Sequence, residues 1–216
     1  IFFLICFQGF IGWYMVSSGL VDRVDVSHFR LAVHLMIAFI ILSLIFWNYL
    51  DLKGLIPADK NINFNLSLLL LIVVYAQITI GAFVSGMDAG TIYNTWPLMG
   101  SNYFPDDNKI SNLFSLSAFN DASLVQFLHR NLAYLIIFIY LYIVFKIYRY
   151  DIKRLYTSIN LIGLFLIIQV ILGILTLLHG AQIYLASMHQ ISSIFLVSSS
   201  IYFLFLNTKF NLQPSN

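Results

Sequence analysis

Six long apolar runs constrain the fold of this chain more than any other feature. They cover residues 1–18, 31–50, 64–86, 123–147, 156–178 and 182–206. A transmembrane helix needs roughly 20 apolar residues, and each run approaches or exceeds that length. Only helices and closed barrels satisfy their backbone hydrogen bonds in lipid, and the runs are continuous rather than alternating. We therefore expect an all-α polytopic membrane protein in which six transmembrane helices are present.

Composition supports a membrane protein and excludes several other classes. The chain is 60% hydrophobic and 9% charged, whereas soluble domains are about half apolar and a quarter charged. The net charge of +2 is too small to suggest a nucleic-acid partner. Cys6 is the only cysteine, which excludes an internal disulfide and a thiolate metal cluster. Because the chain begins inside an apolar run, we expect it to be truncated at its N-terminus.

The basic residues predict an orientation in the membrane. Loops that carry an excess of lysine and arginine stay on the cytoplasmic side. The connections after the second and fourth runs, together with the C-terminus, therefore face the cytoplasm or matrix, and the other connections face outside. Seven basic residues lie on the first side and three on the second: Lys53, Lys60, Lys146, Arg149, Lys153, Arg154 and Lys209 against Arg23, Arg30 and Lys109.

Three histidines lie inside these runs at a common depth. His34 is about four residues from the outer end of its run, and His129 and His189 are about seven residues from theirs. At 1.5 Å per residue, all three lie roughly 5–10 Å below the outer surface. Ionisable side chains are expensive in lipid, so they face the protein interior and usually mark function. The three histidines are therefore candidate functional residues.

A short repeat precedes each of these histidines. The run before each histidine-bearing run contains Gln-x-x-x-Gly, and a small residue follows each histidine by one turn. The glutamine–glycine pairs are Gln8/Gly12, Gln77/Gly81 and Gln169/Gly173, and the small residues are Ala38, Ala133 and Ser193. Repeats of this kind are common in membrane folds. The repeating unit is a helical hairpin, with a Gln/Gly helix running outward and a His helix returning.

The repeat also predicts how the chain is divided. Residues 61–216 form a complete four-helix bundle with two histidines and a structured outer loop at 86–121. Residues 1–60 form the second half of another four-helix bundle. By the same repeat, we expect an absent upstream hairpin with a further histidine, giving eight helices in two pseudo-symmetric four-helix bundles.

Heme is the cofactor that suits three buried histidines best. Histidine is a common axial ligand, and four-helix bundles build cofactor sites from facing helices. A small residue one turn away leaves room for a porphyrin. Zinc fits less well, because the helices hold no thiolate or carboxylate pair. A di-iron site needs Glu-x-x-His pairs, which the sequence lacks. The alternative is that each histidine only hydrogen-bonds a neighbouring helix.

Other polar residues near the outer side are also candidates for a functional role. Arg130 either extends its charge to the interface or forms a bidentate pair with a heme propionate. Arg30, one turn before His34, would serve the same role in the other half. His28, in the first connection, and His179, at the end of the fifth run, are interpreted as exposed or interfacial and not as ligands. The loop at 86–121 is either a packing lid or a cover over a heme or a docking surface.

These stretches resemble the heme A synthase family, of the type without cysteine pairs in its outer loops. The similarity lies in Gln8 to Leu20, Arg30 to Leu35, the Gly86-to-Gly100 loop, Gln126 to Arg130, and Met188 to Gln190. The resemblance implies an oxidoreductase that converts a methyl group of heme O to a formyl group, giving heme A for terminal oxidases. It implies a heme b bound by His129 and His189, and heme O in the N-terminal half with His34 as one ligand.

The resemblance also implies location and partners. We expect a bacterial inner membrane, with the mitochondrial inner membrane as the alternative. Expected partners are the heme O substrate, membrane lipid, heme O synthase or oxidase assembly factors, and an unidentified electron donor. The catalytic residues are expected upstream of Ile1. Two alternatives stay open: a b-type membrane cytochrome that only transfers electrons, and a transporter whose histidine helices line a substrate path.

Overall fold

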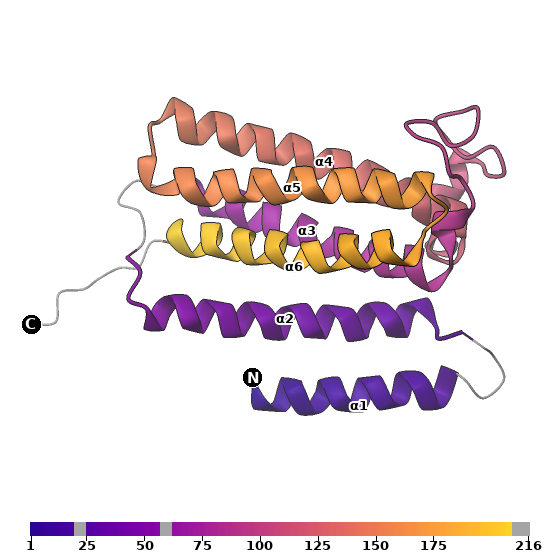
Figure 1. Ribbon diagram of the computed structural model, residues 1–216, viewed down its shortest axis with the longest axis horizontal. Helices are drawn as coiled ribbons and strands as arrows, with labels where there is room; N and C mark the ends of the chain where they lie inside the picture. Colours follow the sequence, from indigo (N-terminus) through magenta and orange to yellow (C-terminus); the bar gives the residue numbers. More distant parts are fainter. Residues whose placement is uncertain (20–24, 57–61, 209–216) are drawn as a thin grey trace, which may run out of the picture.

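The computed structural model describes residues 1–19, 25–56 and 62–208 and is built from helices (Figure 1). No β-strand occurs within these residues, which confirms the all-α class. Five helices, α2 to α6, are long and apolar enough to cross a membrane, and α1 is a shorter apolar helix. The protein is therefore a polytopic membrane protein. The bounds are α1 Phe2–Gly19, α2 His28–Leu52, α3 Phe64–Gly86, α4 Ala122–Arg149, α5 Tyr156–Leu178 and α6 Ile183–Leu206.

Four short 3-10 helices occupy the connections in the part of the chain that the structure describes. η1, η2 and η3 lie between α3 and α4, and η4 leads directly into α5. Their bounds are η1 Ala89–Thr91, η2 Ile110–Phe114, η3 Leu116–Asn120 and η4 Lys153–Leu155. The long connection between α3 and α4 is thus folded, as the sequence predicts.

α2 begins three residues earlier than the apolar run suggests. The prediction that His28 lies in a loop is wrong, because His28 is the first residue of the helix. Its Nε2 lies 3.1 Å from the carbonyl oxygen of Phe119, and its ring packs edge-on against Phe83. A β-carbon added at Gly86 would lie 2.8 Å from Cα of His28, so glycine permits this approach. His28 is half-buried here, whereas His179 is exposed at the end of α5.

Helices α3 to α6 form a four-helix bundle. Each packs against its neighbour in the chain, and α6 closes the bundle against α3. α2 packs on the outside of this bundle against α3 and α6, and α1 packs against α2. Figure 1 shows α1 at the edge of the molecule, with α2 between it and the bundle. The predicted boundary between residues 60 and 61 lies outside the described residues.

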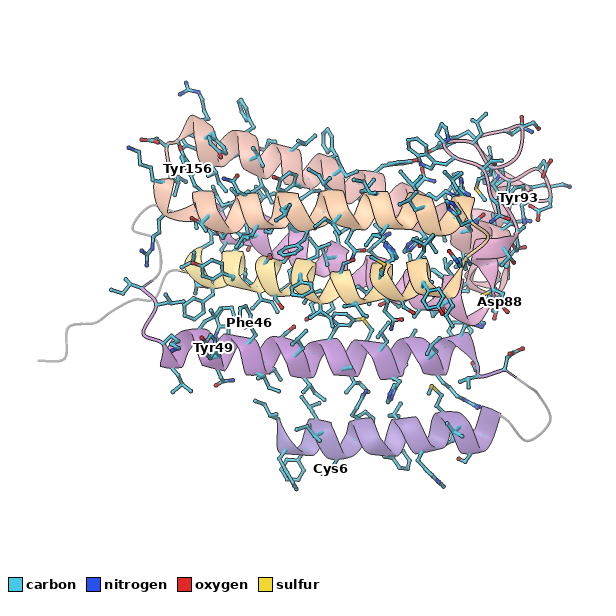
Figure 2. All side chains as sticks on the ribbon, in the orientation of Figure 1. Cys6, Phe46, Tyr49, Asp88, Tyr93 and Tyr156 are labelled. Carbon is cyan, nitrogen blue, oxygen red and sulfur yellow. The ribbon has the colours of Figure 1, made fainter. Side chains whose placement is uncertain are left out.

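The helices alternate in direction, so their ends gather at two ends of the molecule. α1, α3 and α5 end where α2, α4 and α6 begin, and the folded connection between α3 and α4 covers this end (Figure 1). Figure 2 places Asp88 and Tyr93 at this end and Tyr49 and Tyr156 at the opposite end. The connections therefore lie at two opposite ends, and the side of the membrane that each end faces stays a prediction from the basic residues. Of those basic residues, Arg23, Lys60 and Lys209 lie outside the described residues.

A small hydrophobic cluster around Phe83 and Val125 lies beside the folded connection, and the main hydrophobic core fills the half of the bundle away from it. Its largest fully buried side chains come from the last turns of α6 and α4 and from the first turns of α3 and α5: Phe203, Phe205, Ile143, Ile147, Leu70, Ile159 and Ile162. Tight packing there closes one end of the bundle. The other half contains the histidines.

Candidate functional site

His129 and His189 face each other inside the bundle. Their ring centroids are 6.5 Å apart and their planes are nearly perpendicular, at 80°. His129 stands seven residues after the start of α4, and His189 stands six residues after the start of α6. α4 and α6 are not neighbours in the order around the bundle, so the rings meet across its interior. The structure therefore brings these two predicted residues together.

A glycine on the preceding helix gives each histidine its space. A β-carbon at Gly81 would lie 3.1 Å from Cε1 of His129, and one at Gly173 would lie 3.2 Å from Cε1 of His189. Real β-carbons are rarely so close to another atom, so alanine would push either ring away. The glycine of the Gln-x-x-x-Gly repeat thus lies directly beneath the histidine that follows it.

The glutamine of each repeat hydrogen-bonds the same histidine residue. Nε2 of Gln77 donates to the carbonyl oxygen of His129 at 3.1 Å and lies 3.2 Å from its ring Nε2. Nε2 of Gln169 donates to the carbonyl oxygen of His189 at 2.9 Å and to Oγ of Ser192 at 2.7 Å. Both glutamines tie the histidine helix to its partner helix. We call each set of glutamine, glycine and histidine a histidine seat.

A cavity of about 210 Å³ lies between the four helices at this level. Its walls are mainly apolar, and its polar groups converge from several helices, as is typical of cofactor and ligand sites. Both histidines and both seat glutamines line it, together with Arg130 and Trp96 from the covering end. Within the described residues, no group of three or more His, Cys, Asp or Glu side chains lies close enough to hold a metal ion. The cavity thus offers two imidazoles.

The folded connection lies over one end of this cavity, where Gly90 and Trp96 line it, and Arg130 holds the connection there. Nη1 of Arg130 donates to the carbonyl oxygens of Thr95 and Leu98 at 2.9 and 3.1 Å. Nη2 donates to the carbonyl oxygen of Tyr93 at 2.9 Å, and Gln126 donates to the same oxygen at 3.1 Å. The guanidinium therefore binds three backbone carbonyls of the loop, a contact that the sequence did not predict.

Further bonds connect the loop to the bundle and within itself. Nδ2 of Asn94 donates to the carbonyl oxygen of Leu177 at the end of α5, at 2.8 Å. The hydroxyl of Tyr93 donates to Asp106 at 2.5 Å, and this bond, with burial and the charge of Asp107, raises the pKa of Tyr93 to about 12. The loop is thus a structured roof, defined here as residues 89–100, attached to α4 and α5.

His34 occupies a third seat, away from the pair. A β-carbon at Gly12 would lie 3.0 Å from its Cε1, and Nε2 of Gln8 lies 3.2 Å from its Nε2. The seat is formed between α1 and α2. Arg30 donates to Oγ of Ser18 at 2.6 Å and lies over the ring of Tyr14. His34 therefore does not join the pair formed by His129 and His189.

Comparison with known proteins assigns the chain to a family. The family model described as cytochrome oxidase assembly protein matches residues 1–201. The chain belongs to the heme A synthase family. It is 44% identical over 210 residues to the heme A synthase of Pelagibacter ubique, covering 96% of this chain and 61% of the relative.

Other members of the heme A synthase family match in the same way. The enzyme named heme A synthase in Rickettsia felis is 40% identical over 208 residues, which cover 94% of this chain and 61% of the relative. That of Flavobacterium johnsoniae is 40% identical over 204 residues, which cover 91% of this chain and 59% of the relative. The chain thus spans about three fifths of the length of the curated relatives it matches.

Sequence reasoning found the histidines of this heme A synthase family member but missed several of their contacts. The recurrence of Gln-x-x-x-Gly predicted that a glutamine and a glycine accompany each histidine. It did not predict that each glycine contacts the histidine ring directly. Ser192 and Trp96 were not singled out. Ser192 carried a signal, since it is three residues after His189, where the other two histidines are followed by Leu132 and Ile37.

Proposed function

We propose that the protein containing this chain is a heme A synthase that converts a methyl group of heme O to a formyl group. In this proposal His129 and His189 would hold the iron of a heme b in the cavity lined by α3, α4, α5 and α6. The family membership supports the activity. The facing imidazoles inside a mainly apolar cavity support the ligand pair, and their spacing is the single observation on which the pair depends.

The residues present fit a heme. A metal–imidazole bond is about 2.0 Å long, and the ring centre lies about 1.1 Å beyond the bonded nitrogen. Two imidazoles that bind the same iron would therefore have ring centres roughly 6 Å apart. The observed separation is 6.5 Å. Within the described residues, Nδ1 of both rings is buried without a hydrogen-bond partner. Buried polar atoms without partners require an explanation, and a bound metal is one.

The chain's own residues would bind, orient and enclose this group. His129 and His189 would ligate the iron from α4 and α6, while their seats fix the positions of both rings. The roof closes the cavity toward the outer solution, which keeps the site dry and lowers its effective dielectric constant. When bound, the heme supplies one-electron redox chemistry. Arg130 lines the same cavity, and its Nε is buried without a partner among the described residues, which supports contact with a heme propionate.

The hairpin of α1 and α2 would contribute to the substrate site. His34 would ligate the iron of heme O from its own seat, with Nδ1 likewise buried and unpartnered within the described residues. Arg30 lies one turn from His34 and would serve a propionate of that heme. The substrate and the electron donor are part of this proposal, as is the location in a bacterial inner membrane.

Pigment analysis of the full-length protein tests the proposal. The protein would be purified in detergent and its hemes extracted and separated by chromatography. We expect heme B together with heme O or heme A, because the cofactor and the substrate occupy different halves. Heme B alone would instead support a b-type cytochrome that only transfers electrons. A colourless protein without a Soret band would refute both and favour a transporter.

A further inference from the structure

The three histidine seats share one geometry. In each, Cε1 of the histidine lies 3.0 to 3.2 Å from the position that a glycine β-carbon would occupy. The side-chain amide of the glutamine one turn before that glycine contacts the same histidine, through its ring or its carbonyl oxygen. Three independent helix pairs reach the same arrangement, so it is more than incidental packing. The glycine fixes how closely the ring approaches the partner helix, and the glutamine fixes the histidine from the side.

The two seats in the bundle differ in what the glutamine holds. The amide of Gln77 reaches both the ring and the carbonyl oxygen of His129. The amide of Gln169 donates instead to the carbonyl oxygen of His189 and to Oγ of Ser192. A serine hydroxyl accepts such a bond, whereas Leu132, the corresponding residue after His129, cannot. Ser192 therefore diverts Gln169 away from the ring of His189.

We propose that Gln77/Gly81 and Gln169/Gly173 are positioning residues for the two histidines of the bundle, and that, of these two glutamines, only Gln77 fixes the rotation of its imidazole ring. This inference rests on the proposed heme site. The amide of Gln77 lies 3.2 Å from Nε2 of His129, so it restrains rotation of the ring about the bond from Cβ to Cγ. With Nδ1 bound to a metal, Nε2 would carry the ring proton and would donate it to the side-chain oxygen of Gln77, which is buried without another partner among the described residues. The ring of His189 is held in place by Gly173 and by its helix, and its rotation does not depend on Gln169. The angle of 80° between the rings is therefore controlled from the α3–α4 side.

Electron paramagnetic resonance of the full-length ferric holoprotein measures this angle. Nearly perpendicular axial imidazoles give a strongly anisotropic low-spin signal, and parallel ones give a more rhombic signal with a smaller largest g value. The signal from the pair is identified by its loss in His129→Ala. We expect Gln77→Leu to shift the largest g value, because the ring of His129 is released. The matched variant Gln169→Leu should leave it unchanged.

The glycines are tested with the optical spectrum. Gly81→Ala and Gly173→Ala should each lower the low-spin fraction of the heme, because a new β-carbon displaces the ring. Alanine favours a helix over glycine, so a loss cannot be explained by a weaker helix. Gly9→Ala is the control, since no atom lies within 4 Å of its added β-carbon, and the spectrum should not change. If an alanine variant fails to fold, Gln77→Leu tests the proposal without added volume in the seat.

The possible failures are distinguishable. A wild-type protein without heme would refute the proposed function. A heme with the expected axial pair, but with equal g shifts in Gln77→Leu and Gln169→Leu, would overturn the difference between the seats. An unchanged low-spin fraction in both Gly81→Ala and Gly173→Ala would overturn the role of the glycines, and the proposed function would stand.

Discussion

The hairpin of α1 and α2 and the bundle of α3 to α6 contain the same histidine seat in different surroundings. In the bundle, two seats face each other across a cavity, and the roof covers them. In the hairpin, one seat lies between two helices, and α1 exposes large apolar side chains such as Phe3 and Trp13, which are 84% and 64% exposed. A seat alone places one imidazole. Two facing seats under a roof place two imidazoles opposite each other at a fixed spacing.

The contacts that position one histidine differ from the contacts that bring two histidines together. The glutamine and glycine act locally, between two adjacent helices, and they recur wherever the hairpin recurs. The pairing of His129 with His189 depends instead on how α4 and α6 are arranged within the whole bundle. The roof adds a third level, because Arg130 and Asn94 attach it to two different helices. We therefore expect substitutions in the two regions to differ in their effects.

The largest expected effect is loss of the heme signal from the bundle. If the bundle binds the proposed heme, His129→Ala or His189→Ala should abolish its low-spin signal, because each substitution removes one of the two proposed ligands. His34→Ala should leave that signal largely intact and abolish formation of heme A, since it acts in the hairpin. Optical spectra and chromatography of extracted hemes measure both. If His34→Ala erased the bundle heme, the division of roles between the two regions would be wrong.

Removing Arg130 should open the roof. Arg130→Ala deprives three loop carbonyls of a charged donor, and hydrogen bonds to charged groups are worth about 2 kcal/mol each. We expect the loop to lose protection from hydrogen exchange at residues 93–98, while the buried core near Ile143 and Phe203 keeps its protection. Arg30→Ala is the matched control, because it removes an arginine from the hairpin. Equal protection of the roof in both variants would contradict the proposed attachment.

The same substitution in the two regions should change stability in opposite directions. A β-carbon at Gly163 would collide with the hydroxyl of Tyr140, whereas one at Gly9 would meet no atom within 4 Å. Overpacking of this kind costs about 1–3 kcal/mol, while glycine to alanine in an open helix gains up to about 1 kcal/mol. Thermal unfolding in detergent should therefore show a lower midpoint for Gly163→Ala and an equal or higher one for Gly9→Ala. A stabilised Gly163→Ala would disprove this close contact.

The smallest expected effect is a dependence on acid at the start of α4. Burial raises the pKa of Asp121, but hydrogen bonds from the Leu124 backbone, Ser123 and Asn108 outweigh it, so the pKa is lowered. The ionised cap therefore stabilises the protein above about pH 3.9, the ordinary pKa of aspartate, and this stabilisation is lost as the pH falls further.

The variant Asp121→Asn keeps a capping side chain without a titrating group. We expect its resistance to an acid-active protease to change less between pH 5 and pH 3, by an equivalent of about 1 kcal/mol or less. Parallel pH profiles for the wild type and the variant would show that the carboxylate is not responsible.

Much of this fold is predictable because the length and apolarity of a membrane helix can be recognised in the sequence. The predicted runs agree with the helix bounds to within three residues. The largest difference is at α2, where apolarity begins at Leu31 but the helical backbone begins at His28. Hydropathy reports burial in lipid, and the first turn of a helix at the interface need not be apolar. The ring of His28 instead packs against Phe83, and its Nε2 contacts the carbonyl oxygen of Phe119; both partners are distant in sequence.

The site was only partly predictable. The depth of the histidines and the recurrence of Gln-x-x-x-Gly follow from regular periodicity, so a sequence reveals them. The bonds from Arg130 to the loop join residues more than 30 positions apart, and they involve backbone carbonyls that no residue type encodes. The diversion of Gln169 by Ser192 depends on side-chain geometry between two helices. Such contacts become visible only when the helices are placed in space.

The roof is held by main-chain oxygens rather than by the side chains of Tyr93, Thr95 and Leu98. Each of these residues presents the same acceptor whatever its side chain is. Evolution is therefore free to vary the outward chemistry of this loop, and with it whatever meets the loop from outside, without loosening its attachment. The cost of change falls instead on the few side chains that make the attachment, which are the guanidinium of Arg130 and the amides of Gln126 and Asn94.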